Sequence, residues 1–393
     1  MNNTSLNTLY HSLSKSGVKS LTLSNFRNYQ FLKLEPKFGP IIIYGQNGSG
    51  KTNILEALSL LSPGRGLRSS KLSEIQRIGP ALVQGFDDTA FSWGINANIF
   101  KNEDEYNIGT GIEKGAVYDK RIIKLNGEKI SSQAELGKYI SALWLTPQMD
   151  RIFNKGSSQR RSFLDRLVYA FDIEHAKRTA QFEHLYKEWV ELLKRGIKDN
   201  NWLFAIEEKM ACLGVAIAAA RVEHVNKLNS WIEEEPESVF PSVDIKLVGI
   251  IEEMLATKKA LEVEDCYKIL LYNNRSRAIE SSIDGIGKTD MKVTYKKKHM
   301  PAELCSTGEQ KSLLITIILA QTKAQSLNQG FAPILLLDEV CAHLDEEKKE
   351  ALLDKILELK IQAFITATDK EMFSSLASKA QFIEVKNNAV QIF

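Results

Sequence analysis

The chain has 393 residues, and its 51 Lys and Arg residues nearly balance 49 Asp and Glu residues, for a formal charge of +2. Apolar residues make up 44% and charged residues 25% of the sequence, which excludes a mostly disordered, collagenous or coiled-coil chain. This length predicts two to three domains, and a charge so near neutrality ordinarily counts against a nucleic-acid partner.

The cysteines and the apolar runs exclude two further classes of protein. Cys212, Cys266, Cys305 and Cys341 lie far apart without a C-x-x-C pair. This spacing excludes a disulfide scaffold or a zinc ribbon and suits a reducing cytosol. No apolar run reaches the roughly 18 residues that a membrane-spanning helix needs.

The N-terminal region predicts a tail followed by strands. Residues 1–17 are polar, rich in Ser and Asn and free of acids, and we expect a flexible tail there. Residues 18–23 and 29–34 alternate apolar and polar side chains as half-buried strands do, with a turn at 25–28 between them. The β-branched run at 41–44 predicts a strand that is buried on both faces.

The rest of the chain divides into a β-rich, a helical and an α/β region. Residues 53–61 have helical spacing, whereas 64–127 contains Gly, Asn and short alternating segments that predict mainly strands. The sequence then predicts long helices at 160–171, 173–195 and 202–232. The last hundred residues predict helices at 307–327, 346–359 and 370–376 and strands at 334–337, 363–366, 382–385 and 390–393.

A glycine-rich loop lies between the predicted strand at 41–44 and the predicted helix at 53–61. It fits the phosphate-loop pattern G-x-x-x-x-G-K-[ST] with Gly45, Gln46, Asn47, Gly48, Ser49, Gly50, Lys51 and Thr52. The glycines let backbone N–H groups point inward around phosphates, and the helix start adds its positive end. We expect Lys51 to reach the β- and γ-phosphates of a nucleotide and the Thr52 hydroxyl to bind Mg²⁺.

A second Gly-Lys-Thr sequence occurs at 287–289. It has Ser282 where the pattern requires Gly, and no apolar strand leads into it. We therefore do not expect this segment to bind nucleotide through the phosphate-loop pattern.

The apolar strand predicted at 334–337 ends in two carboxylates, Asp338 and Glu339. In a phosphate-loop NTPase an Asp at such a strand end holds Mg²⁺, and a neighbouring Glu can activate the attacking water. Lys51 and Asp338 are much farther apart in the sequence than a compact nucleotide-binding core requires. A large insertion is therefore predicted between them, with the helical region at about 160–300 as the candidate.

A third motif precedes the helix predicted at 307–327. It reads Cys305, Ser306, Thr307, Gly308, Glu309, Gln310, Lys311. A hydroxyl and a Gly at a helix start form an anion-binding corner. The simpler interpretation is a helix cap by Ser306 or Thr307, with Gln310 closing a capping box.

The order of these motifs resembles the ABC-type ATPases, and more closely the RecF family, which is related to SMC and Rad50 heads. The resemblance spans about 18–393 and rests on the segments 23–29, 45–57, 145–148, 160–165, 306–311 and 337–339. It implies an α/β fold, namely an ABC-type P-loop ATPase head with an inserted, mainly helical arm domain. The head would comprise 18–160 and 300–393, and the arm 161–299.

The resemblance also implies roles for single residues. ATP would lie between two subunits, with Lys51 and Thr52 of one subunit and Ser306 and Gly308 of the other. Further implied roles are Gln148 as γ-phosphate sensor, Asp338 with Thr52 at Mg²⁺, Glu339 as general base, Asp345 at the dimer seam and Arg27 at the nucleotide.

Some positions depart from the family pattern. The third motif is similar to the signature of ABC-type ATPases, Ser-x-Gly-Glu/Gln, which begins at Ser306 here, and Cys305 stands where the signature has Leu. The segment 285–290 lacks the His of the family's Gly-Pro-His-Arg-x-Asp motif. No His follows the last core strand at 366–369. The resemblance therefore implies a weak ATPase, stimulated by DNA, in which slow hydrolysis acts as a switch.

Basic residues are unevenly distributed. They exceed acids in 151–200 and in the run 291–300, whereas acids exceed bases in 331–360. Binding through phosphates needs only a local basic surface and carries little sequence information. The predicted contacts for DNA of any sequence are Arg160, Arg161, Lys296, Lys297 and Lys298.

The resemblance implies a cytoplasmic bacterial protein that dimerises on ATP, binds single-stranded or gapped DNA and works in recombinational repair and replication-fork maintenance. Its implied partners are RecR and RecO, with which it would promote RecA loading at gaps. The alternative is the cytosolic ATPase subunit of a membrane transporter. An SMC-type structural head would require longer arms than 173–232, and a small-molecule P-loop kinase is a further alternative.

Overall fold

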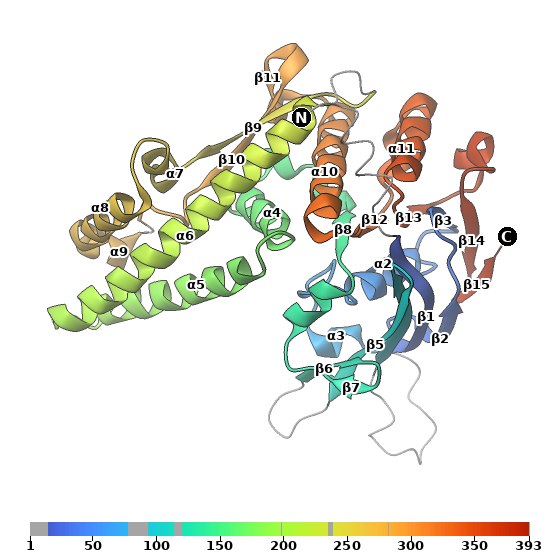
Figure 1. Cartoon of the computed structure of the whole chain (residues 1–393), viewed down its shortest axis with the longest axis horizontal. Coiled ribbons are helices and arrows are strands. Elements are labelled where there is room, and N and C mark those ends of the chain that lie inside the picture. Colours follow the sequence, from blue (N-terminus) through green and yellow to red (C-terminus); the bar gives the residue numbers. More distant parts are fainter. Residues whose placement is uncertain are drawn as a thin grey trace. The chain divides into compact units, whose positions relative to one another are not determined.

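The computed structural model describes residues 15–77, 93–113, 120–197, 199–234, 239–281 and 283–392 (Figure 1). The chain divides into two compact units. The first unit comprises Met1–Met149 and Thr322–Phe393, and the second comprises Asp150–Gln321. The second unit thus contains the whole predicted arm together with residues on both sides of it.

A mixed sheet with the strand order β15-β14-β3-β13-β12-β8 forms the centre of the first unit. Its strands are β3 (Pro40–Tyr44), β8 (Ala142–Leu145), β12 (Ile334–Leu337), β13 (Ala363–Ala367), β14 (Gln381–Lys386) and β15 (Ala389–Ile392). All neighbours are parallel except β15, which returns antiparallel to β14. The carboxyl ends of β3, β13 and β12 therefore meet at one edge of the sheet.

Burial explains why these segments form the central strands. Every side chain of β12 and β13 is buried, as are Ile41, Ile42 and Ile43 of β3. Continuous apolar runs of this kind are typical of parallel strands covered on both faces. Helix α2 (Lys51–Ser59) contacts β8 and β13, and α11 (Glu346–Glu358) contacts β3.

An antiparallel sheet with the order β2-β1-β4-β5-β6-β7 completes the first unit. Its strands are β1 (Ser16–Phe26), β2 (Tyr29–Leu34), β4 (Gly94–Lys101), β5 (Asp104–Glu113), β6 (Lys120–Leu125) and β7 (Glu128–Lys129). Leu21, Leu23, Ile95 and Ala97 alternate with polar side chains and join the core beneath the sheet. This alternation is the pattern of strands with one solvated face.

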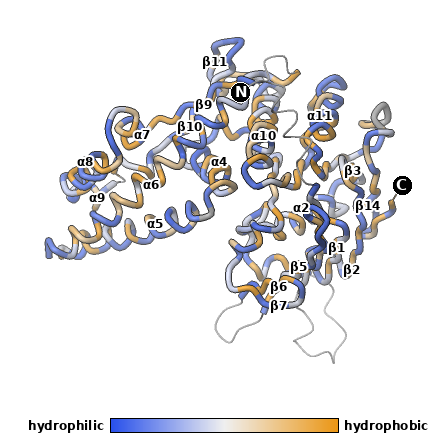
Figure 2. The backbone as a smooth tube through the Cα atoms, viewed as in Figure 1, coloured by the Kyte–Doolittle hydropathy of each residue, from blue (hydrophilic) through white to orange (hydrophobic). Residues whose placement is uncertain are grey.

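Helices dominate the second unit. They are α4 (Ser157–Tyr169), α5 (Ile173–Lys194), α6 (Asn200–Glu233), α7 (Ile250–Leu255), α8 (Ala260–Asn273) and α9 (Arg275–Glu280). Figure 1 shows α5 and α6 side by side, and Figure 2 shows hydrophobic and hydrophilic residues alternating along them. The small residues Ala211 and Ala218 of α6 join Trp189 and Tyr267 in the core of this unit.

A small antiparallel sheet and a long helix complete the second unit. The sheet has the order β11-β10-β9 and consists of β9 (Val243–Val248), β10 (Asp290–Tyr295) and β11 (Met300–Pro301). Helix α10 (Thr307–Gln329) begins in this unit and ends in the first one. Short helices of the second unit are η4 (Ile152–Asn154), η5 (Lys296–Lys298) and η6 (Ala302–Leu304), and those of the first unit are α3 (Leu72–Ile75), η2 (Gln133–Lys138), η3 (Pro147–Met149), η7 (Val340–His343) and η8 (Glu371–Leu376).

The α/β class is confirmed, with shifts at individual elements. The turn predicted at 25–28 is shorter because β1 continues through Phe26, and the segment predicted as a helix at 370–376 is the 3₁₀ helix η8. Of the predicted tail, Ser16 and Gly17 begin β1, whereas 1–14 lie outside the described residues. Parts of the predicted β-rich region, 78–92 and 114–119, also lie outside them.

Across the described residues, we find no helix of the length and apolar character required to cross a membrane.

A buried polar cluster connects three helices of the second unit with the segment before β10. Arg221 is 2% exposed and donates to both oxygens of Asp165 at 2.8 and 2.9 Å. It also donates at 3.0 Å to the hydroxyl of Thr289, which donates to Glu252 at 2.7 Å. Thr289, the last residue of the second Gly-Lys-Thr sequence, is thus fully buried in structural contacts. Its hydroxyl is not exposed to bind a nucleotide.

His224 of α6 is buried in the second unit beside Gln321. Its Nε2 lies 2.9 Å from Gln321 Oε1, and its ring lies 4.8 Å from that of Phe171. Burial lowers the pKa of His224 from 6.5 to about 4 because the charged imidazolium is poorly solvated there. His224 is therefore neutral in the folded protein at neutral pH.

This depressed pKa predicts a pH-dependent free energy of unfolding. Below pH 6.5 His224 is protonated in the unfolded chain, whereas in the folded chain it stays neutral down to about pH 4. Its contribution to the free energy of unfolding is therefore complete above pH 6.5 and is lost as the pH falls towards 4. From pH 7.5 to 5.0 the loss amounts to about 2 kcal/mol. Urea unfolding of wild type and His224→Gln at both pH values measures it, and the variant should lose about 2 kcal/mol less. Equal losses in both proteins would contradict this assignment.

Candidate functional site

The loop between β3 and α2 has the backbone geometry that a phosphate requires. Gly45, Gly48 and Gly50 have φ values of 150°, 78° and 110°, a region that side-chain-bearing residues rarely adopt. A Cβ atom at Gly45 would lie 2.3 Å from the carbonyl oxygen of Val385, and one at Gly50 would lie 2.4 Å from Asn28 Nδ2. The loop therefore depends on glycine for both backbone conformation and space.

Two hydroxyl groups at this loop are buried without a hydrogen-bond partner in the described part of the chain. They are Ser49 Oγ and Tyr29 Oη, and the latter lies 2.6 Å from the position of a Cβ at Gly50. Buried hydroxyls are normally hydrogen-bonded. The Ser49 hydroxyl has no acceptor for its proton, and a phosphate oxygen bound in the loop would provide one. This supports the prediction that the loop binds phosphate.

Lys51 is folded over the loop. Its ammonium donates to the carbonyl oxygens of Gly45 at 2.6 Å and of Gln46 at 2.9 Å. Burial lowers the pKa of Lys51, while the carboxylates of Glu339 and Asp338 oppose that change. Phosphate oxygens would replace these two carbonyl oxygens as acceptors for the ammonium.

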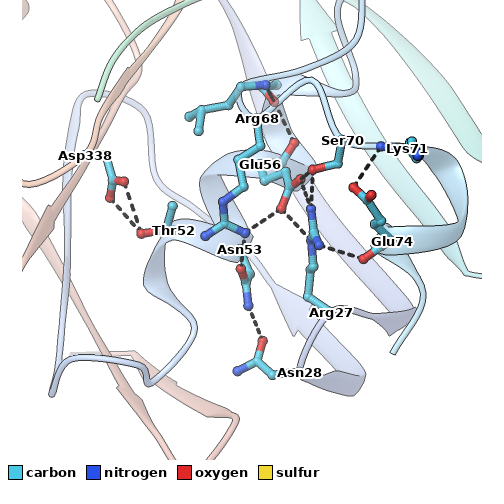
Figure 3. Close-up of polar contacts among 12 residues, drawn as sticks. Arg27, Asn28, Thr52, Asn53, Glu56, Arg68, Ser70, Lys71, Glu74 and Asp338 are labelled. Atoms are coloured by element: carbon cyan, nitrogen blue, oxygen red, sulfur yellow. Dashed lines mark hydrogen bonds and ion pairs between the residues drawn. The ribbon is translucent and has the colours of Figure 1, made fainter. Parts of the chain in front are cut away.

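Thr52 and Asp338 meet across the edge of the central sheet, as Figure 3 shows. The Thr52 hydroxyl lies 2.9 and 3.1 Å from the two oxygens of Asp338. The hydroxyl of Thr366, at the end of β13, donates to Asp338 Oδ1 at 2.7 Å. Sequence reasoning missed Thr366, because its role depends on β13 lying between β3 and β12.

The oxygen atoms of Thr52 and Asp338 fit the predicted Mg²⁺ ion. Among the described residues, no three His, Cys, Asp or Glu side chains come together as a metal-binding cluster. Mg²⁺ is commonly held by one or two carboxylates together with water and substrate phosphates, so a single Asp beside a hydroxyl suffices. Thr52 and Asp338 would hold the ion, which would neutralise charge on the phosphates of a nucleotide.

Glu339 has a left-handed backbone conformation, with φ 53°, where β12 ends. Its backbone N–H donates to the Thr366 hydroxyl at 2.8 Å, so the same threonine holds both acidic residues. A non-glycine residue in this conformation is uncommon and is often found at functional sites. Glu339 is half-buried, and its carboxylate is near enough to Lys51 to oppose the fall in the pKa of that ammonium.

Gln148 and Asp345 are two further predicted residues of the first unit. Gln148 is an exposed residue of η3, shortly after β8, whose Leu145 carbonyl accepts from the Asp338 backbone N–H at 2.9 Å. Asp345 caps α11 by accepting from Lys348 N at 2.9 Å, and it pairs with the Lys348 ammonium at 2.7 Å. These contacts lower the pKa of Asp345, and its predicted role at a dimer seam stays a prediction.

Arg27 belongs to a network of hydrogen bonds and ion pairs around Glu56 of α2 (Figure 3). Its guanidinium donates twice to Glu56, at 2.8 and 2.5 Å, and once to Ser70 at 2.6 Å. Arg68 reaches the same buried Glu56 at 2.8 Å. Most Arg27 donors are therefore used within the protein, and its contact with a nucleotide stays a prediction.

Asn28 ties the first hairpin to the phosphate loop. Its Nδ2 donates to the Ser49 carbonyl at 3.2 Å and to Asn388 Oδ1 at 2.5 Å, and its Oδ1 accepts from Asn53 at 2.7 Å. The turn that contains Asn388 also lines a cavity of about 560 Å³ beside loop residues 44–49. This cavity offers room next to the loop for the remainder of a nucleotide.

Ser306 and Gly308 belong to the second unit, whereas the phosphate loop belongs to the first. Ser306 caps α10, and Glu309 closes the capping box by accepting from Ser306 N at 2.8 Å. The prediction that Gln310 closes this box is therefore wrong by one position. Gln310 is buried and donates instead to Asn154 at 3.1 Å and to the Cys305 carbonyl at 2.9 Å.

The predicted DNA contacts differ in their availability. Arg160 is buried and donates to both oxygens of Asp290 at 2.7 and 2.8 Å, so its prediction as a surface contact is wrong. Arg161 is half-buried and donates to the Thr289 carbonyl at 2.9 Å. The remaining candidates lie on η5 (Lys296–Lys298).

The lysines of η5 also differ from one another. Lys296 pairs with Glu233 at 2.6 Å, and Lys298 pairs with Glu309. Lys297 is exposed and makes no ion pair with any described residue. Lys297 is therefore the member of this run with an ammonium available for a phosphate.

Residues 17–391 match the family described as RecF/RecN/SMC N terminal domain. The DNA replication and repair protein RecF of Allorhizobium ampelinum is 42% identical over 382 residues, which cover 96% of this chain and 99% of that protein. The protein of the same name from Rhizobium etli (strain CIAT 652) is 43% identical over 379 residues, with the same coverage.

Solved structures share the fold. The recombination mediator protein RecF-ATPrS in RecFOR pathway superposes with a TM-score of 0.81 at 24% identity, covering 98% of this chain and 100% of that one. An Smc head domain from Pyrococcus furiosus, bound to the C-terminal domain of ScpA, gives a TM-score of 0.51 at 16% identity, with 96% of each chain covered. At these identities the likeness concerns the fold, which is that of an ABC-type ATPase head.

The glycines of the loop provide a matched pair of substitutions. Gly50→Ala should cost about 2 to 5 kcal/mol, since it combines a left-handed backbone with overlap against Asn28 and Tyr29. Gly48→Ala keeps the backbone penalty alone, about 1 to 2 kcal/mol, because nothing lies within 4 Å of its Cβ position. Thermal unfolding and binding of a fluorescent ATP analogue measure both effects. Equal losses for the two variants would contradict the close approach at Gly50.

Proposed function

The chain belongs to the RecF family of DNA replication and repair proteins, and from this membership we propose an ATP-dependent DNA-binding protein of recombinational repair and replication-fork maintenance. The observation that carries the proposal is the meeting of the phosphate loop with Asp338, through the Thr52 hydroxyl at 2.9 Å. This pairing joins a phosphate cradle to a metal ligand at one sheet edge. The same membership makes this function a better candidate than the ATPase subunit of a membrane transporter.

ATP binding in this proposal uses residues of the first unit. The loop from Gly45 to Thr52 cradles the phosphates with backbone N–H groups, and Ser49 Oγ gains the partner that it otherwise lacks. The Lys51 ammonium moves from carbonyl to phosphate oxygens. Thr52 and Asp338 supply the protein ligands of Mg²⁺, which neutralises phosphate charge when bound.

Two copies of the chain then enclose ATP. Ser306 of the partner subunit and Gly308 of the partner subunit complete the site, with the start of α10 directed at the γ-phosphate. Asp345 lies at the seam. Binding of ATP thus favours a dimer, and the loss of the γ-phosphate reopens it.

Hydrolysis in this proposal is slow and serves as a switch. Glu339 accepts a proton from the attacking water, and Gln148 senses the γ-phosphate and the metal. The end of β13 and the segment after it contain Thr366 and Asp369 but no His, which is consistent with a weak ATPase that DNA stimulates.

The wider role rests on the family. We propose that the dimer binds single-stranded or gapped duplex DNA of any sequence and promotes RecA loading at gaps with RecO and RecR. The solved relatives are described as members of a RecFOR pathway, which supports these partners. The proposed location is the bacterial cytoplasm.

Sedimentation with and without ATP tests this function. Wild type should shift from monomer to dimer with ATP, and Lys51→Met should remain monomeric because it lacks the ammonium that binds phosphate. Glu339→Gln should still dimerise and should remain dimeric, because the water is no longer activated.

Two results would contradict the proposal. A monomeric wild type at saturating ATP excludes the ATP-driven dimer. Normal hydrolysis by Glu339→Gln refutes the assignment of Glu339 as the base. Repeating the run with gapped DNA shows whether the dimer also carries DNA.

The DNA contact predicts a salt-dependent affinity. Lys297→Ala should weaken binding of a gapped duplex and reduce the slope of log K against log salt by about 0.9, the value for one lost phosphate contact. Lys379→Ala is the control, because Lys379 pairs with Glu350 and Asp354 in the acidic part of the chain. Affinity that does not change with salt would overturn binding through phosphates.

A further inference from the structure

The hydroxyl of the signature serine is already in use in the second unit. Ser306 Oγ donates to Glu309 Oε2 at 2.9 Å, and the Glu309 backbone N–H donates to Ser306 Oγ at 3.3 Å. A serine hydroxyl has a single proton to donate. Ser306 must therefore release Glu309 before it donates to a phosphate oxygen.

Glu309 keeps its negative charge beside that serine. Its carboxylate accepts from Lys298, from Ser306 N at 2.8 Å and from Ser306 Oγ. These bonds, that from Lys298 first, lower the pKa of Glu309 to about 2. A γ-phosphate that approaches Ser306 would thus meet a carboxylate of like charge unless a cation compensates it.

The Lys298 ammonium is the cation that compensates the charge of Glu309, and its neighbours fix its position. It ends η5, and His299 reverses the chain with φ 48°, so that β10 and β11 form a hairpin near the start of α10. The Lys298 ammonium lies 5.6 Å from the centroid of the Tyr295 ring, which adds a second favourable contact. The bond to Glu309 raises the pKa of Lys298, so the ammonium stays charged.

We propose that Lys298 is a positioning residue for the signature serine: by compensating Glu309, it allows the Ser306 hydroxyl to turn from Glu309 to the phosphate of an ATP held by a second copy. This inference rests on the proposed ATP-driven dimer and adds to it a residue outside the signature sequence. Without Lys298, Glu309 holds both Ser306 donors alone and repels the arriving phosphate. The retained Ser306 hydrogen bonds and the repulsion of phosphate by Glu309 both weaken the dimer.

Two roles of Lys298, compensating the charge of Glu309 and supporting the start of α10, predict different results for a double variant. If Lys298 acts through the charge of Glu309, then Glu309→Gln removes the need for it, because a neutral amide neither repels phosphate nor binds Ser306 as strongly. Lys298→Ala would then have almost no effect in the Glu309→Gln background. If Lys298 only supports the start of α10, the two substitutions add.

Sedimentation at a series of protein concentrations with saturating ATP measures the dimer affinity of each variant. Lys298→Ala should weaken the dimer by roughly five- to tenfold, and Lys298→Arg should stay within about twofold of wild type. Glu309→Gln should dimerise at least as well as wild type, and Lys298→Ala with Glu309→Gln should return to within about twofold of it. Lys227→Ala breaks a comparable exposed ion pair, with Glu223 at 2.6 Å, and should behave as wild type.

Monomeric ATP binding separates this inference from the proposed function. A fluorescent ATP analogue should bind Lys298→Ala and wild type equally at protein concentrations below dimerisation, because Lys51 and Thr52 are unchanged. If wild type does not dimerise with ATP, the proposed function fails and this inference fails with it. If wild type dimerises and Lys298→Ala dimerises equally well, or if Glu309→Gln does not rescue it, the inference alone is overturned.

Discussion

The parallel order of the central sheet is the constraint on which the nucleotide site depends. Because β3, β13 and β12 run parallel in that order, their carboxyl ends meet, and residues far apart in the sequence become neighbours. Thr52 and Thr366 both bond Asp338 at this edge, at 2.9 and 2.7 Å. The two hydroxyls, one from helix α2 and one from strand β13, hold the carboxylate, so that a metal ion would meet an already oriented ligand.

The phosphate loop is held from outside this sheet as well. Asn28, in the first hairpin, bonds the Ser49 carbonyl, and Tyr29 packs so close to Gly50 that no side chain fits there. Val385 closes the other side against Gly45. The loop conformation is thus imposed by its neighbours before a nucleotide arrives, which reduces the ordering that binding requires.

Sequence reasoning found the parts of the site that local pattern encodes and missed those that depend on strand order or register. The phosphate loop follows from a strand, a loop and a helix that are contiguous, and Asp338 follows from the apolar strand that directly precedes it. Thr366 carries no local signal, since only the position of β13 between β3 and β12 brings it to Asp338. Glu309 and Gln310 differ by one position on α10, and that single step exchanges a capping residue for a buried one. The sequence predicted Arg160 as a surface cation because its partner, Asp290 of β10, is far from it in the sequence.

A mixing experiment tests the central claim, that each ATP site is built from two copies of the chain. Lys51→Met lacks a working phosphate loop, and Ser306→Arg lacks a working signature, so neither should dimerise with ATP alone. A mixture can form one intact site, from the loop of the Ser306→Arg chain and the signature of the Lys51→Met chain. Sedimentation of the mixture with ATP should show a dimer that contains both chains. A mixture that stays monomeric, while wild type dimerises, would contradict a site shared between subunits.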